Sequence, residues 1–129
     1  MRNLLALVLL TAFPYSGFAA TTTCIVEGGS TTVKAVAWDD ETNVAKVTDH
    51  LGNTREGRVT LESDHNHWKK VNIFVDYEST YYGVDAAEYI VFSTLPGTYR
   101  IIGVAYIVRD GELFLNSSHG NYAANCVAM

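Results

Sequence analysis

The chain lacks a long apolar segment after its N-terminus, a surplus of basic residues and closely spaced cysteines. No later apolar run approaches the roughly 20 residues that cross a bilayer as a helix. Lys and Arg number 9 against 14 Asp and Glu, a net charge of -5. This balance argues against nucleic acid as a partner, because phosphates demand a basic surface. The cysteines number only 2 and lie far apart in the sequence, which argues against a redox-active C-x-x-C pair.

Motifs for catalysis and for cofactor binding are also missing. The chain has no G-x-S-x-G nucleophile elbow. Ser118 and His119 are adjacent, so in a strand they would point to opposite faces. Most of the Asp residues fall in predicted turns, where their side chains bond to the backbone. We therefore expect a non-enzymatic protein with no catalytic residue and no cofactor.

The first twenty residues have the pattern of a secretory signal. Arg2 precedes an apolar run from Leu4 to Phe13, and Gly17 and Ala19 are the small residues of a cleavage site. We expect a signal peptide over residues 1–19 and a single domain over residues 20–129, secreted or periplasmic and without membrane contact after cleavage. Loss of Arg2 makes the mature chain more acidic by one charge.

Cys24 and Cys126 lie at opposite ends of the mature domain. In an oxidising compartment such a pair is expected to form a disulfide, with free thiols or intermolecular bridges as the alternatives. A closed loop of about 100 residues is credited with about 4 to 5 kcal/mol in the chain-entropy model. The pair therefore predicts a structural clasp.

Short runs rich in Val, Ile, Thr, Tyr and Phe recur between clusters of Gly, Asp, Asn and Ser, the pattern of an antiparallel all-β domain. The expected strand segments are Thr22–Glu27, Thr31–Trp38, Asn43–Thr48, Thr54–Glu62, Trp68–Tyr77, Glu88–Ser93, Tyr99–Val108, Glu112–Asn116 and Tyr122–Val127. The last must meet the first if the cysteines are joined. We therefore predict a small antiparallel meander β-barrel of about eight strands closed by a terminal disulfide, with a β-sandwich as the runner-up.

Several connections have turn chemistry. Leu95-Pro96-Gly97 predicts a type II turn, and Asp110-Gly111 is the strongest hairpin signal in the chain. Ser117–Asn121 is predicted to turn again. The segment Glu78–Ala87 is predicted to be a long loop, with a short helical turn over Val84–Ala87.

The predicted function is an exported binding protein, an inhibitor or accessory factor for a basic secreted or envelope protein. The contact surface is expected to combine the loops Asp39–Thr42, Ser63–His67 and Glu78–Ala87. Tyrosine offers a large amphipathic contact area at low conformational cost. Tyr81 and Tyr82 are therefore predicted as anchors, with Asp76 and Glu78 as charge complements.

Two alternatives belong to other functional classes. A barrel of about eight strands can hold one small ligand, so the protein could instead be a small-ligand carrier. His65 and His67 form an H-x-H pair, which in an extended segment projects both imidazoles to one side, as a metal-binding protein or metalloenzyme would require. We expect no bound metal and keep these two histidines as the candidates.

The opening of the domain, with Cys24, Gly28-Gly29 and Val33, resembles the small periplasmic inhibitors of C-type lysozyme. The resemblance implies an export signal, a compact β-barrel and a bridge from the first strand to the C-terminus. The Ser-Gly-bearing inhibitory loop of that family has no counterpart here, because Ser118-His119-Gly120-Asn121-Tyr122 comes too late in the chain and has a different spacing. The likeness therefore concerns architecture, which does not transfer function.

Overall fold

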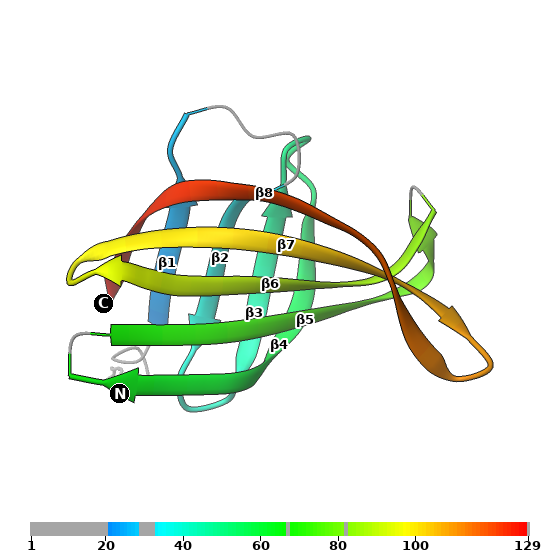
Figure 1. Cartoon of the computed structure of the whole chain (residues 1–129), viewed down its shortest axis with the longest axis horizontal. Coiled ribbons are helices and arrows are strands. Elements are labelled where there is room, and N and C mark those ends of the chain that lie inside the picture. The colour runs from blue at the N-terminus through cyan, green and yellow to red at the C-terminus, as the bar shows by residue number, and fades with distance from the viewer. Residues whose placement is uncertain (1–20, 29–32, 67, 82, 129) are drawn as a thin grey trace, which may run out of the picture.

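A computed structural model describes residues 21–28, 33–66, 68–81 and 83–128, without the side chains of residues 78–81 and 119. The predicted signal peptide lies outside the described residues. The described part of the chain forms eight strands (Figure 1), which are β1 (Thr21–Val26), β2 (Val33–Asp39), β3 (Val44–Asp49), β4 (Thr54–His65), β5 (Trp68–Tyr81), β6 (Val84–Leu95), β7 (Thr98–Arg109) and β8 (Glu112–Ala128). Among these residues, no helix is long and apolar enough to cross a membrane.

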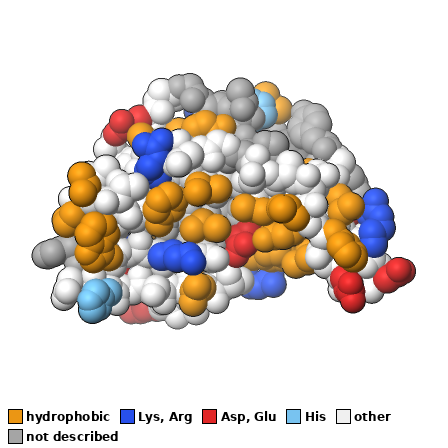
Figure 2. Space-filling model, viewed as in Figure 1, with side chains coloured by type: hydrophobic (Ala, Val, Ile, Leu, Met, Phe, Trp, Pro, Cys, Tyr) orange, Lys and Arg blue, Asp and Glu red, His pale blue; other side chains and the backbone are white. Residues whose placement is uncertain are grey.

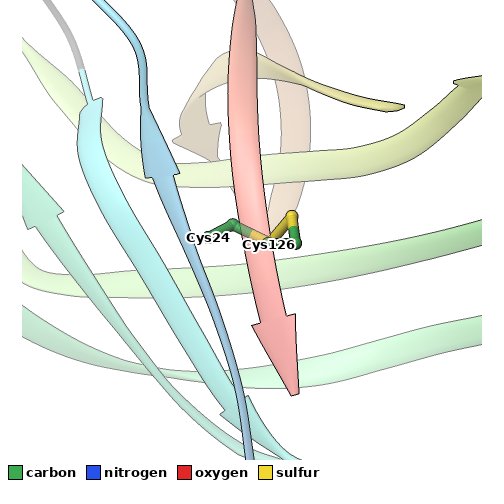
Figure 3. The surroundings of a disulfide bond; sticks show 2 residues. All are labelled: Cys24 and Cys126. Atoms are coloured by element: carbon green, nitrogen blue, oxygen red, sulfur yellow. A yellow bond between two sulfur atoms is a disulfide. The ribbon is translucent and has the colours of Figure 1, made fainter. Parts of the chain in front are cut away.

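Each strand pairs antiparallel with the next, and β8 pairs with β1, so the sheet closes into a barrel. This confirms the predicted eight-strand meander barrel over the runner-up sandwich. Cys24 on β1 lies directly opposite Cys126 on β8, and their sulfurs form the predicted disulfide across this seam (Figure 3). Cys24 is fully buried, and Cys126 packs against the core. The covalent bond therefore joins the two strands that complete the ring.

The barrel is flattened into two layers whose strands cross at a steep angle. In Figure 1, β1, β2 and β3 run across the back while β5 to β8 run lengthwise in front. The first half of β4 pairs with β3 and its second half with β5. In the same way, β8 pairs with β7 along most of its length and with β1 only from Ala124 to Ala128. β4 and β8 therefore carry the sheet from one layer into the other.

A bulge and a glycine mark the corner in β4. Val59 pairs with Ile73 but Leu61 pairs with Asn72, so one extra residue enters β4 and bends it. At Gly57 a Cβ would lie 2.7 Å from the backbone oxygen of Phe74. The strand can pass this close to β5 only without a side chain. The sequence predicts Arg55, Gly57, Val59 and Leu61 on one face of this strand, but the bulge breaks the alternation and leaves Leu61 exposed.

The corner in β8 replaces a predicted turn. Ser117–Asn121 is predicted to reverse the chain. Instead, β8 continues through these residues as one strand, and its pairing with β7 has two register shifts. Gly120 has a φ of +65°, and a Cβ there would meet the ring of Tyr122 at 2.1 Å. Arg100 donates hydrogen bonds to both the side-chain and backbone oxygens of Asn121. A Gly- and Asn-rich stretch serves a bulge as readily as a turn, which explains the error.

The segment Glu78–Ala87 also differs from its prediction. Its described residues form neither a long loop nor a helical turn, because β5 continues to Tyr81 and β6 begins at Val84. A register shift between Asp76 and Tyr81 disturbs the alternation over this stretch. Because the segment lacks the apolar–polar alternation of a strand, its sequence predicts a loop.

The remaining turn predictions are confirmed. Leu95 pairs with Thr98 around Pro96 and Gly97, with Gly97 at a φ of +82°. Arg109 pairs with Glu112 around Asp110 and Gly111, both of which have positive φ. These two hairpins set the register of β7 against both of its neighbours.

Alternate residues of the strands fill the barrel interior. Trp38, Ile73 and Ile101 are the largest fully buried side chains, and they belong to one core cluster with Val26, Val33, Val36, Ala45, Val47, Val71, Val75, Ala87, Tyr89, Val91, Ala124 and Cys24. In the sequence, Val71, Ile73, Val75 and Tyr77 alternate with Lys70, Asn72, Phe74 and Asp76, which predicts one inner and one mixed face for β5. The burial of Val71, Ile73 and Val75 confirms the inner face. The opposite face of β5 to β8 therefore has no part in this core.

The corner at Gly57 predicts a steric penalty for any added side chain. We expect Gly57→Ala to lower the free energy of unfolding by about 1 to 3 kcal/mol, because backbone and not a flexible side chain must give way. Denaturant unfolding of the oxidised protein measures this change. Glu56→Ala, an exposed neighbour on the same strand, should change it by no more than about 0.5 kcal/mol. Equal stability of the two variants would contradict this account of the corner.

The disulfide predicts a loss of stability on reduction. We expect Cys24→Ala/Cys126→Ala to lower the free energy of unfolding by about 2 to 5 kcal/mol, because the long loop is released in the unfolded state. The reduced native protein separates the lost covalent link from the lost packing of the sulfurs, since its thiols still fill the core. An unchanged denaturation midpoint after reduction would show that hydrogen bonds alone hold the seam.

Candidate protein-binding surface

The outward face of β5 to β8 carries large apolar side chains. Residues that alternate with the buried core positions form an outer patch, defined as Phe74, Ile90, Phe92, Ile102, Val104 and Tyr106 together with Asn72 and Glu88; all eight are half-buried. The strand registers place these residues in adjacent rows. Figure 2 looks onto this face and shows the apolar side chains gathered across it. A sheet face that is largely apolar although it does not pack against the core is typical of an interaction surface.

A carboxylate lies within the outer patch. Glu88 pairs across the sheet with Phe74 on one side and Val104 on the other. One of its oxygens accepts a hydrogen bond from Asn72 Nδ2 at 2.9 Å, and the other accepts one from the Tyr106 hydroxyl, also at 2.9 Å. Asn72, Glu88 and Tyr106 come from three different strands, so only the sheet register brings them together.

The environment of Tyr106 holds its proton. Partial burial, the hydrogen bond to Glu88 and the negative charge of Glu88 all raise the pKa of Tyr106 above its ordinary value of 10.0. The hydroxyl therefore remains a donor to Glu88 throughout the neutral range. Among the residues that the structure describes, no lysine or arginine forms an ion pair with Glu88.

Cations lie at the border of the outer patch. The guanidinium of Arg58 on β4 stacks over the Phe74 ring at 4.8 Å from its centroid. On the face of β5 that carries Val71 and Ile73, outside the outer patch, Lys69 lies 3.4 Å from Glu62 and 3.3 Å from Asp64 on β4. Burial lowers the pKa of Lys69, but hydrogen bonds and attraction to these two carboxylates outweigh it and raise the pKa above 10.5. In the end row of the outer patch, Lys70 and Arg100 are the cross-strand neighbours of Phe92, and Arg100 is hydrogen-bonded to Asn121.

The β7–β8 arm, defined as residues 107–115, extends the surface. Figure 1 shows this hairpin reaching beyond the body of the barrel. The register sets Leu113 opposite Val108 and Phe114 opposite Ile107, so apolar side chains point to both faces of the arm. Leu113, Phe114 and Leu115 are 50%, 47% and 68% exposed.

The base of the arm is tied to β6. Asp85 accepts a hydrogen bond from the backbone N–H of Val108 at 2.8 Å, and the same oxygen lies 3.5 Å from Arg109 Nη1. The Val108 N–H that donates to Asp85 lies beyond Ala86 and Tyr106, the last paired residues of β6 and β7 at this end. The direction of the arm is therefore set by a contact outside the regular ladder.

The predicted contact residues are only partly placed. Asp76 is exposed and lies in the row of Ala86 and Tyr106, at the border of the outer patch. The side chains of Glu78 and Tyr81, and the whole of Tyr82, lie outside the described residues. Asp76 thus lies beside the outer patch, and the contact roles of all four residues stay predictions.

The three predicted contact loops do not gather at one end of the barrel. Ser63–His67 and Glu78–Ala87 lie at opposite ends of β5, a strand of 14 residues, as Figure 1 shows. Asp39–Thr42 joins β2 to β3 in the other layer. A single contact surface built from all three loops is therefore not what the fold presents.

The histidine pair is divided between described and undescribed residues. His65 ends β4, is exposed and pairs with Trp68, while His67 lies outside the described residues. Within the described ranges, no three His, Cys, Asp or Glu side chains gather in a group that could hold a metal ion.

The outer patch and the arm were missed at the level of sequence, although two signals existed. Tyr89 to Phe92 and Ile101 to Val108 are nearly continuous apolar runs, and in an antiparallel sheet such runs indicate apolar side chains on both faces. Leu113-Phe114-Leu115 breaks the period of two in the same way. The position of Glu88 against Asn72 and Tyr106 had no such signal.

The fold and this surface define a small disulfide-closed β-barrel with an exposed apolar sheet face. No known protein family, curated protein or solved structure matches the chain.

The raised pKa of Tyr106 predicts a component of alkaline instability. Above pH ~10 the unfolded state ionises this phenol first, so stability falls as pH rises toward the higher folded pKa. We expect Tyr106→Phe to flatten the fall in unfolding free energy between about pH 9 and about pH 11, while Lys69 contributes equally to both proteins. Glu112→Gln, on the arm, should leave the slope unchanged. A Tyr106→Phe slope as steep as the native one would contradict the assignment.

Proposed function

We propose that the protein is an exported, non-enzymatic binding protein that contacts a basic protein partner through the outer patch and the β7–β8 arm. The observation that carries the proposal is the outer patch itself, which places large apolar side chains on the solvent side of a sheet whose other side already packs the core. Inhibition of the partner or assistance to it are the two outcomes such a contact can have.

The composition of the surface supports a protein partner. Protein interfaces combine a central apolar and aromatic area with a polar rim. The outer patch supplies Ile90, Ile102 and Val104 in its middle rows, with the aromatic rings of Phe74, Phe92 and Tyr106 around them and Arg58 and Asp76 at its border. The arm adds apolar side chains on both faces, an arrangement suited to an element that a partner covers from two sides.

The net charge supports a basic partner, and the disulfide supports an exported location. A net charge of -5 favours encounter with a basic protein, mainly through the association rate. The Cys24–Cys126 disulfide indicates an oxidising compartment, such as the periplasm or the extracellular space. Export through residues 1–19 follows from the sequence pattern alone.

The interior favours this function over a small-ligand carrier. Side chains from seven of the strands meet in one core cluster that includes Trp38 and Tyr89. A carrier would instead devote the barrel interior to a cavity lined for its ligand. The solvent-facing apolar area lies outside the barrel, where a macromolecule can reach it.

Capture of partners from an envelope or secreted extract at low salt tests the proposal. We expect Ile102→Gln, in the middle of the outer patch, to reduce retention of the captured basic protein by at least about tenfold, as for a central interface residue. Ile25→Gln on β1, where Ile25 is 55% exposed on the other layer, is the matched control and should retain the partner fully.

Purified partner and variants then give dissociation constants at several salt concentrations, with thermal unfolding confirming that both variants are folded. Equal binding of the Ile102 and Ile25 variants, or no basic protein retained by the native protein, would contradict the proposal.

A further inference from the structure

We propose that Glu88 is the receptor for an arginine side chain of the bound partner. This inference rests on the proposed function and names the chemistry at the centre of its surface. The occupant is a guanidinium presented by a basic protein, and the site consists of Glu88, Asn72 and Tyr106, framed by Phe74 and Val104.

The geometry of Glu88 leaves room for such a ligand. A carboxylate offers about four lone-pair positions, and Asn72 and Tyr106 occupy one on each oxygen. These two donors hold the carboxylate in a fixed orientation on the outward face. The unused lone pairs of both oxygens can accept the paired N–H groups of a guanidinium, which binds carboxylates in a bidentate manner.

The amide of Asn72 shows that this arrangement is costly to the fold. Its Nδ2 is committed to Glu88, while its Oδ1 is buried and has no hydrogen-bond partner. A reversed amide would place Oδ1 against the carboxylate, so Glu88 itself dictates the orientation. A buried acceptor without a donor is unfavourable and is rare enough in folded proteins to require an explanation. Holding Glu88 ready for a ligand supplies one.

The electrostatic setting selects a cation. Glu88 has no lysine or arginine partner among the described residues, and its cross-strand neighbours are Phe74 and Val104. Covering this area with a partner would remove water from an uncompensated carboxylate, which is unfavourable unless the partner brings a positive charge. Arginine suits the site better than lysine because its planar group also stacks on aromatic rings.

A minimal probe tests the site without knowledge of the partner. The native protein is titrated with N-acetyl-arginine amide, and the uncharged N-acetyl-citrulline amide serves as the matched probe, with backbone amide resonances followed by NMR. We expect the arginine probe to shift the resonances of residues 72–74, 88 and 104–106, and the citrulline probe to leave them in place. Glu88→Gln should weaken the response by at least about tenfold, since it removes the charge from the pair.

Glu56→Gln is the control variant, because it neutralises an exposed carboxylate outside the outer patch and the arm and should keep the native response. A response spread evenly over the exposed carboxylates of Asp40 and Glu41, or one that survives Glu88→Gln, would overturn the inference. The captured partner separates this result from the proposed function. If Ile102→Gln abolishes partner binding and Glu88→Gln does not, the arginine site is wrong while the binding surface stands; if neither variant affects binding, both are wrong.

Discussion

Closure of the ring between β1 and β8 constrains the rest of the structure, because the two strands differ greatly in length. β1 has 6 residues and β8 has 17, so β1 can pair only with the C-terminal end of β8. The same imbalance holds for the layers, since β2 and β3 have 7 and 6 residues while β5 and β7 have 14 and 12. A closed barrel can use only as much of the long strands as the short strands can match. The excess length must project, and it forms the β7–β8 arm and the wide front sheet.

This imbalance also determines how the apolar side chains are divided. The core cluster takes the inner residues of every layer, including Trp38 from the short strands and Ile101 from the long ones. Most outer residues of β6 and β7 are also apolar, yet no element of the described chain covers them. Core packing therefore accounts for Val91 and Ile101 but not for Ile90 and Ile102, their neighbours in sequence. The second pair needs a reason outside the fold.

Sequence patterns predicted the structure correctly where a residue type has one common structural role. Val71, Ile73 and Val75 revealed the inner face of β5, the Pro96-Gly97 pair revealed its turn, and two cysteines in an exportable chain revealed the seam. They were insufficient where one residue type serves two purposes.

Gly120 and Asn121 read as a turn but form a bulge, and Gly57 gave no sign that β4 passes close to the backbone of β5. Contacts between strands distant in sequence, such as Asn72 with Glu88, depend on register, which bulges shift by single residues. The outer patch as a set of apolar residues could have been read from the sequence, whereas its hydrogen-bonded centre could not.

In the outer patch, the apolar side chains determine affinity and Glu88 determines specificity. Apolar area contributes roughly 25 cal/mol per Å² removed from water, and any apolar partner of suitable shape can gain it. Glu88 opposes that permissiveness, because an apolar partner would bury its charge without compensation. The hydrogen bonds from Asn72 and Tyr106 reduce this cost only in part, since both donors are neutral and already present in the free protein. A partner that brings a cation to Glu88 gains the apolar area and avoids the penalty, so one carboxylate converts a generally adhesive face into a selective one.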